Sequence, residues 1–184
     1  LALDAGMQPY KFSKQDEEKE ERLKIYNTIL EKYINFCHHE LISGKYPEFL
    51  EYLYKRKTTK KEITFFKIGY APAQSHFYEQ LKKEFDEKQI SASGIYYFDE
   101  NKKKYVDRFR NRIIFPVRSL NGATLAIGGR SILKSAFAKY INSPETEFYK
   151  KGNNLYNIND AKGQGDKESE VFIVEGYMDV INLH

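Results

Sequence analysis

The sequence contains no tryptophan and a single cysteine, Cys37, among its 184 residues. One cysteine excludes an intramolecular disulfide framework and cannot form a cysteine-rich zinc cluster unaided, which suits a reducing compartment. No apolar run approaches the roughly 18 residues that cross a bilayer, and the first residues lack the basic-then-apolar pattern of a secretion signal. We therefore expect a cytoplasmic protein without a membrane partner.

What remains is the composition of a globular protein. Hydrophobic residues make up 41% of the chain and aromatic residues 15%, which is enough for a packed core and too much for a disordered chain. The length allows one ordinary domain, or one domain with part of a second.

Positive charge is concentrated in one stretch. Residues 101–151 contain 12 lysines and arginines but three acidic residues, a net charge of +9 in a chain whose total is +4. Such a stretch is typical of an anion-facing surface, and phosphates or nucleic acids are its commonest ligands. The alternative is a solvated lysine-rich face, which we favour for Lys102, Lys103 and Lys104 because they lie in a polar turn.

The amino-terminal half has the apolar spacing of helices. Residues 1–15 are predicted to be a linker from an upstream segment, because Gly6 and Pro9 break regular structure early. Apolar residues then recur at helical spacing from Asp16 to Ser43. Shorter helices are predicted from Pro47 to Lys57, from Thr59, from Ser75 through Phe85, and in the residues before Gly94.

Cys37, His38 and His39 are adjacent within the first predicted helix. Consecutive helical residues point roughly 100° apart, so the three side chains cannot all face one metal ion. We interpret them as ordinary helix residues.

The period changes to that of strands in the second half. Residues 67–71, 95–98 and 113–117 are strand-like, and Pro116 is expected to break the last of these. Asn121 and Gly122 between two such runs predict a β-hairpin with a type I′ turn, in which both central residues have positive φ. The fold class expected is α+β, with a helical amino-terminal part followed by a small, mostly antiparallel sheet.

Arginines cluster around this hairpin. Arg108, Arg110 and Arg112 alternate, so a strand would place them on one face, where an ion-pair network and a phosphate-binding surface are equally compatible with the pattern. The glycines at 128 and 129 allow close approach of a ligand or another backbone, and Arg130 follows them directly.

Residues 139–156 mix cations, aromatic rings and amides with little periodicity, which is typical of functional segments. Lysines there could neutralise phosphates, Tyr140 could stack on a base, and Asn142 could donate hydrogen bonds. The mixture favours a nucleotide or single-stranded nucleic-acid ligand.

The last motif follows four apolar residues, 171–174, which predict a buried strand. Glu175 falls at the carboxyl end of this strand, Gly176 permits a sharp turn, and Asp179 lies about one helical turn further on. Two carboxylates so placed could hold a divalent ion through oxygen ligands. A strand with an acidic end and a helix-capping aspartate is an equally good interpretation of this motif alone.

In this order the motifs resemble those of bacterial DNA primase of the DnaG type. The resemblance covers nearly the whole chain, and its terminal motif, called TOPRIM, is shared with topoisomerases whereas the others are not. The segments that carry it are Tyr52–Arg56, Phe66–Pro72, Asp107–Val117, Ile127–Arg130, Lys139–Thr146, Phe148–Tyr156 and Val174–Asp179.

The resemblance implies a polymerase that copies single-stranded DNA into short RNA primers from ribonucleoside triphosphates at replication forks. It divides the chain into a linker (1–15), the amino-terminal subdomain of the catalytic core (16–168), and the first strand and helix of a TOPRIM α/β fold (169–184). Glu175 and Asp179 become the candidate catalytic and metal-binding residues. The candidate nucleotide- and template-binding residues are Arg56, Arg112, Arg130, Lys139, Tyr140, Asn142 and Lys151.

The same resemblance implies Mg²⁺ or Mn²⁺ at the TOPRIM carboxylates, an RNA–DNA hybrid as product, and a zinc ribbon before Leu1. The further TOPRIM aspartates and a domain that binds the replicative helicase would lie beyond His184. One departure concerns Lys57, where the family usually has glycine, which puts in doubt the turn that follows Arg56.

Two other functions fit the residues. One is a non-catalytic module that binds single-stranded nucleic acid, and the other is a different TOPRIM enzyme, such as a topoisomerase or a nuclease. An Asp-x-Asp motif downstream would indicate an enzyme, whereas Cys and His at zinc spacing upstream would indicate a primase.

We predict that these 184 residues alone do not synthesise primers, because carboxylates from one strand cannot hold the two metal ions of phosphoryl transfer. The assay is dinucleotide formation by the purified segment with Mg²⁺, single-stranded template and ribonucleoside triphosphates. Magnesium-dependent dinucleotide product would contradict the prediction.

Overall fold

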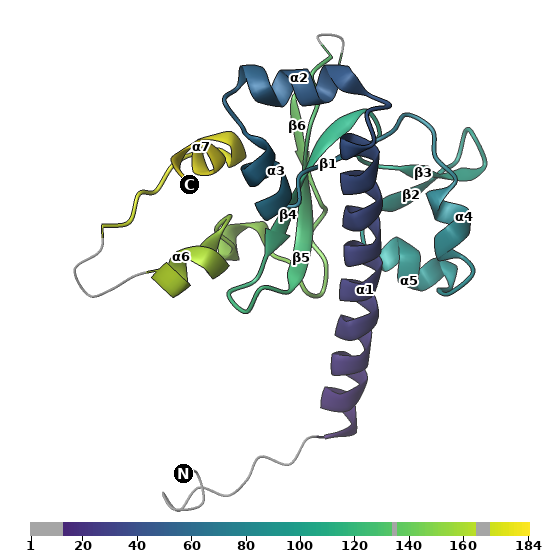
Figure 1. Cartoon of the computed structure of the whole chain (residues 1–184). Helices are drawn as coiled ribbons and strands as arrows, with labels where there is room; N and C mark the ends of the chain where they lie inside the picture. The colour runs from purple at the N-terminus through teal and green to yellow at the C-terminus, as the bar shows by residue number, and fades with distance from the viewer. Residues whose placement is uncertain (1–12, 134–135, 165–169) are drawn as a thin grey trace, which may run out of the picture.

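The computed structural model describes residues 13–133, 136–164 and 170–184. Most of the predicted linker, and the lysine at position 134, lie outside the described residues. Within them, helices surround a small antiparallel sheet (Figure 1). None of the helices in these ranges is long and apolar enough to cross a membrane.

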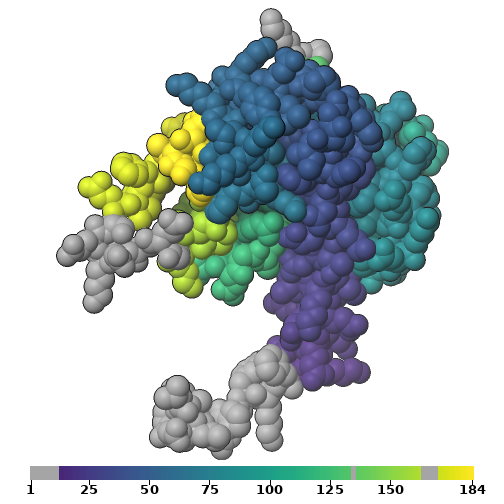
Figure 2. Space-filling model, viewed as in Figure 1, coloured from purple at the N-terminus to yellow at the C-terminus, as the bar shows by residue number. Residues whose placement is uncertain are grey.

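Helix α1 (Lys14–Ile42) is the long helix predicted from residues 16–43. Ser13 caps it in a capping box with Asp16, which satisfies two of the free amide groups of the first turn. The first turns are exposed and extend away from the rest of the molecule (Figures 1 and 2), whereas the later turns carry Ile29, Tyr33 and Cys37 into the core.

The shorter helices follow the sequence signals, with one correction. Capping boxes at Thr59 and Asp86 start α3 and α5. Ser75, however, does not cap the next helix, because α4 begins after His76 and has no side-chain cap, and this helix ends at Leu81 and does not reach Phe85. The helices after α1 are α2 (Pro47–Lys55), α3 (Lys60–Phe65), α4 (Phe77–Leu81), α5 (Glu87–Ala92), α6 (Ile158–Gln164) and α7 (Tyr177–Leu183), with a 3₁₀ turn η1 at Lys151–Asn153.

The principal sheet has four antiparallel strands in the order β1-β4-β5-β6, and a separate two-stranded ribbon pairs β2 with β3. This confirms the expected combination of helices with small antiparallel sheets. The strands are β1 (Gly69–Ala71), β2 (Tyr96–Asp99), β3 (Lys104–Asp107), β4 (Arg112–Arg118), β5 (Thr124–Arg130) and β6 (Tyr140–Asn142).

Strand β4 continues through Pro116, so the expected break is wrong. Pro116 pairs with Ile127 of β5, while β1 pairs with β4 only from Arg112 to Ile114. Pro116 therefore lies beyond the end of β1, on the part of β4 where a missing amide hydrogen is tolerated.

The hairpin between β4 and β5 is confirmed, but its turn type is not. Among Asn121 and Gly122, only Gly122 has a positive φ, at 82°. The Gly122 amide donates to Ser119, and the Ser119 amide donates to Ala123, which closes a three-residue loop. This is the geometry of a right-handed turn followed by one left-handed glycine, which needs no positive φ at Asn121.

The three alternating arginines do not share a strand face. Arg108 and Arg110 lie in the turn between β3 and β4, and only Arg112 enters β4. Arg108 donates to the carbonyl oxygen of Gly94, and Arg110 donates to that of Asp107. The turn breaks the alternation, because Asn111 adopts a left-handed φ of 58°.

The sheet is covered on both faces. On one face, α1 crosses β1 so closely that a Cβ at Gly69 would lie 2.7 Å from the backbone of Cys37. His38 follows, with Nδ1 2.7 Å from the carbonyl oxygen of Ile68. On the other face, Phe115 packs in a second cluster with buried residues of α2, α3 and α7, including Met178.

A buried polar contact joins α1 to the β3–β4 turn. The hydroxyl of Tyr33 donates to the Asp107 carboxylate, at 2.9 and 2.8 Å from its two oxygens, and the amide of Phe109 donates to it at 2.6 Å. Despite these donors, removal from water raises the pKa of Asp107 to about 6. The folded protein therefore binds a proton at Asp107 more tightly than the unfolded chain does.

We predict that Asp107 makes the free energy of unfolding fall as pH rises. Its stabilising contribution is complete below the unfolded pKa near 4 and is lost as pH passes the folded value near 6, a decrease of about 2 kcal/mol between pH 4.5 and 7.5. Urea denaturation at the two pH values measures the change. Asp107→Asn should lose this component of the pH dependence, and an unaltered difference between the two pH values would contradict the assignment.

Candidate functional site

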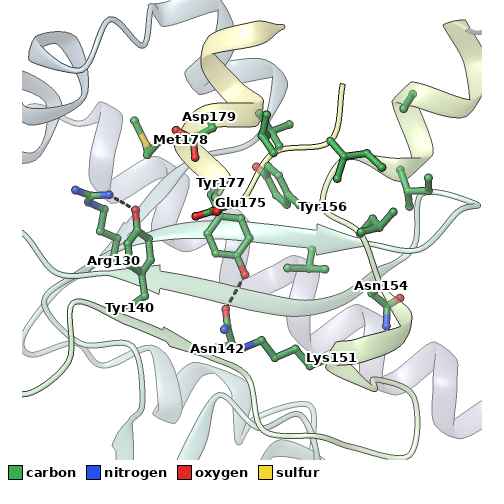
Figure 3. Close-up of a pocket in the computed structure, with 18 of the residues that line it drawn as sticks. Arg130, Tyr140, Asn142, Lys151, Asn154, Tyr156, Glu175, Tyr177, Met178 and Asp179 are labelled. Atoms are coloured by element: carbon green, nitrogen blue, oxygen red, sulfur yellow. Dashed lines mark hydrogen bonds between the residues drawn. The ribbon is translucent and has the colours of Figure 1, made fainter. Parts of the chain in front are cut away.

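A pocket of about 670 Å³ opens at the β5–β6 edge of the sheet (Figure 3). Its walls come from β5, β6, the carboxyl end of α2, η1, residues 171–176 and the start of α7. Eight of the nine candidate site residues line it, although they are spread over more than a hundred positions of the chain. They are Arg56, Arg130, Lys139, Tyr140, Asn142, Lys151, Glu175 and Asp179.

Arg130 is the buried cation of the pocket. It is the last residue of β5, and its side chain is 4% exposed. Its guanidinium carbon lies 4.8 Å from the ring centre of Tyr140 and 5.2 Å from that of Tyr52. Its Nη1 donates a hydrogen bond to the Tyr140 hydroxyl. No described residue accepts a hydrogen bond from its Nε. A guanidinium in a pocket wall is suited to bind a phosphate oxygen.

Three exposed cations line the pocket together with this arginine. Arg56 lies at the carboxyl end of α2, beside the ring of Tyr52, Lys139 precedes β6, and Lys151 begins η1. None of the three forms an ion pair within the described ranges. With four cations and two carboxylates in its walls, the pocket favours an anion of more than one charge.

The turn after Arg56 has the shape that a glycine would give. Lys57 adopts a left-handed φ of 65°, a region that non-glycine residues rarely occupy. The amide of Lys57 donates to Tyr54 and that of Thr58 donates to Leu53, which hold the lysine in this conformation. The departure from the family pattern at Lys57 therefore leaves the turn in place and adds backbone strain.

The acidic motif differs from its prediction. Residues 171–174 form no strand, and Val171, Phe172 and Ile173 are 70–83% exposed. A strand needs a neighbouring strand for its backbone hydrogen bonds, and no described residue supplies one here.

The two carboxylates themselves are exposed at the pocket. Glu175 precedes α7, and Asp179 lies in its first turn, where a Cβ at Gly176 would be 3.0 Å from the Asp179 carboxylate. Gly176 therefore makes room for Asp179. Among the described residues, no three His, Cys, Asp or Glu side chains form a group that could hold a metal ion.

Arg112 is the candidate residue that the structure leaves outside the pocket. Its guanidinium donates to the carbonyl oxygens of Ala138 and Lys139, at 2.9 and 3.3 Å. Burial and the neighbouring Arg110 lower the pKa of this guanidinium. Arg112 thus supports the segment that carries Lys139.

Sequence reasoning missed Tyr177, whose ring fills the space above Gly128. A Cβ at Gly128 would lie 2.5 Å from this ring, and a Cβ at Gly129 would lie 2.8 Å from Phe109. The two glycines therefore allow the side chains of Tyr177 and Phe109 to lie close to the strand. We had expected a ligand or another backbone segment at these positions. The Tyr177 hydroxyl donates to Asn142 Oδ1 at 2.6 Å (Figure 3), and burial raises the pKa of this hydroxyl. Its place inside the acidic motif was the only signal available in the sequence.

Comparison with known proteins places this chain in one family. Residues 36–162 match the family model described as the amino-terminal domain of the DNA primase catalytic core. The DNA primase of Staphylococcus epidermidis is 33% identical over 183 residues, a match that covers 98% of this chain and 30% of that protein. The chain thus spans less than a third of the length of this curated relative.

Solved structures agree with the sequence matches. A DnaG primase catalytic domain bound to single-stranded DNA matches with a TM-score of 0.79 and 28% identity, covering 89% of this chain and 53% of that one. The Aquifex aeolicus primase, solved with its zinc-binding and RNA polymerase domains, matches with a TM-score of 0.78 and 28% identity. That match covers 99% of this chain and 43% of that one.

We predict that Lys57→Gly raises the free energy of unfolding by about 0.5–1 kcal/mol, because glycine adopts the left-handed conformation without steric cost. Chemical denaturation measures the change. The matched control is Lys61→Gly, at a right-handed position of α3, which should lower stability by about 1 kcal/mol. A destabilised Lys57→Gly protein would show that the lysine side chain has a stabilising contact that outweighs the strain.

Proposed function

This chain belongs to the DNA primase catalytic core family, and from that premise we propose that the protein containing it synthesises short RNA primers on single-stranded DNA from ribonucleoside triphosphates. The observation that carries the proposal is the convergence of Arg56, Arg130, Lys139 and Lys151 with Glu175 in one pocket. A triphosphate needs several cations around it, and the transfer of its nucleotidyl group needs carboxylates that hold divalent metal.

In this proposal the buried cation and the exposed cations have different roles. Arg130, held between two tyrosine rings, offers a rigid donor to a phosphate oxygen, because burial leaves its guanidinium few other conformations. The exposed lysines, Lys139 and Lys151, neutralise charge over a wider area. Tyr140 is 37% exposed and presents a ring to the pocket on which a base or sugar could pack.

Glu175 and Asp179 are the residues that would hold Mg²⁺ or Mn²⁺. Their oxygens are the ligands that these hard cations prefer, and both carboxylates line the same pocket as the cations. A bound divalent ion would polarise the triphosphate and lower the pKa of the attacking hydroxyl. The chain's own contribution is to hold these two carboxylates beside the phosphate-binding arginine.

We also propose the chain's place in a larger protein. Residues 16–168 would form the amino-terminal subdomain of the catalytic core, and residues 169–184 would start the TOPRIM subdomain. The template strand and the RNA–DNA hybrid would be bound by the whole core, and the replicative helicase by a separate domain. The exposed apolar residues Val171, Phe172 and Ile173 support this division, because no described residue pairs with them as a strand and such a subdomain would supply one.

A second function is favoured for the segment by itself. The pocket has two carboxylates, Glu175 and Asp179, but four cations and the ring of Tyr140. The segment alone is thus better equipped to bind a nucleotide or single-stranded DNA than to catalyse. Template-dependent RNA synthesis by the full-length protein tests the primary proposal, and its absence under conditions where DNA is bound would leave this second function.

We predict that Lys139→Ala weakens binding of a labelled single-stranded DNA oligomer by the full-length protein. The slope of log affinity against log salt concentration should fall by about one unit, because one phosphate contact is lost. Fluorescence anisotropy at several salt concentrations measures both quantities.

The matched control is Lys104→Ala. Lys104 is also exposed and has no ion-pair partner among the described residues, but it lies on the β2–β3 ribbon away from the pocket. Its removal should leave affinity and salt slope close to the parent values. Equal effects of the two substitutions would point to nonspecific attraction by the whole basic surface.

A further inference from the structure

Tyr177, which is not one of the proposed binding residues, forms a hydrogen bond with Asn142, which is one of them. Asn142 lies in β6 directly opposite Gly128 of β5. Because Gly128 has no side chain, the Tyr177 ring lies against the strand at this point and reaches the neighbouring Asn142 (Figure 3). Its hydroxyl donates to Asn142 Oδ1 at 2.6 Å.

The Tyr177 ring is held from three sides. It stacks on Phe115 with a centroid distance of 5.1 Å and an interplanar angle of 4°, and it meets Tyr156 edge-on at 4.8 Å. On the third side the ring lies so close to Gly128 that a Cβ at this position would not fit between them. The hydroxyl is therefore fixed in place before any ligand binds.

In this hydrogen bond the Asn142 amide has Oδ1 turned toward the Tyr177 hydroxyl. With Oδ1 engaged by Tyr177, the amide nitrogen Nδ2 is the group left for a ligand, and it makes no hydrogen bond with the described residues. An amide nitrogen donates and cannot accept. The pocket wall thus has a neutral hydrogen-bond donor at Asn142 in addition to the positive charges of Arg130 and Lys139.

We propose that Tyr177 is a positioning residue that presents the Asn142 amide nitrogen to the bound nucleotide. The inference rests on the proposed function, and it assigns a hydrogen-bond acceptor, such as a phosphate or sugar oxygen, to the ligand group that Asn142 contacts. Tyr177 also lies between Glu175 and Asp179 in sequence, so the same residue ties the acidic motif to the nucleotide-binding strands.

The test compares Tyr177→Phe, Asn142→Ala and the double variant in the full-length protein. Tyr177→Phe keeps the ring and its packing but removes the hydroxyl, so the melting temperature should change little. The KM for ATP in template-dependent RNA synthesis with Mg²⁺ should rise about three- to tenfold, which is the effect of one hydrogen bond, while kcat changes less.

The double variant identifies the route of the effect. If Tyr177 acts through Asn142, the double variant should have the same KM as Asn142→Ala alone, because no amide remains to be positioned. The matched control is Tyr156→Phe, which removes the neighbouring hydroxyl that has no partner among the described residues and should leave KM unchanged.

Each outcome separates the inference from the function on which it rests. A raised KM in Asn142→Ala with a normal KM in Tyr177→Phe would overturn the positioning role and leave the proposed function intact. Additive effects in the double variant would also overturn it, because they would show that Tyr177 acts independently of Asn142. If the parent protein makes no RNA on a template, the proposed function itself fails.

Discussion

Strand β5 is the constraint on which the rest of the structure depends. It lies between β4 and β6, and the two glycines before Arg130 bring different partners close to its two faces. On one side Phe109 occupies the space beside Gly129, and on the other Tyr177 occupies the space above Gly128. With both faces covered at van der Waals distance, the end of β5 cannot shift, and Arg130 leaves the sheet at a defined position inside the pocket. A methyl group at either glycine would displace an aromatic ring and the residues behind it.

The electrostatics of the pocket follow from this arrangement. Burial of Arg130, which is 4% exposed, costs solvation free energy, and cation–π contact with the rings of Tyr52 and Tyr140 offsets part of that cost. The nearby lysines stay in water and retain full mobility. The pocket thus combines one rigid positive charge, which can select a geometry, with mobile charges that increase the attraction of any polyanion.

Local patterns predicted what depends on neighbours in sequence. Periodicity was sufficient for α1, and the pair Asn121 and Gly122 was sufficient for a hairpin. The errors concern features that depend on distant residues. Whether Pro116 breaks β4 depends on where β1 ends, and whether residues 171–174 form a strand depends on a partner strand. The arginines at 108 and 110 were misplaced because alternation was extended across a turn.

The grouping of eight of the nine candidate residues in one pocket was predicted for a different reason. Its residues were found through the resemblance of whole motifs, which already contains information about three-dimensional proximity. That information does not extend to supporting residues: Tyr52 belonged to a matching motif, but nothing in it indicates that its ring packs on Arg130. Tyr177 was missed for the same reason, since its role depends on an empty space above a glycine of another strand.

Because Cys37 is buried, the rate at which its thiol is alkylated can report on the contact between α1 and β1. The thiol is 0% exposed and lies where α1 approaches Gly69 most closely, and burial raises its pKa well above the ordinary value. Alkylating reagents attack the thiolate, so the folded protein protects this cysteine twice, by access and by ionisation. Because the chain contains no second cysteine, its alkylation rate reports how often α1 lifts from the sheet, with no engineered probe.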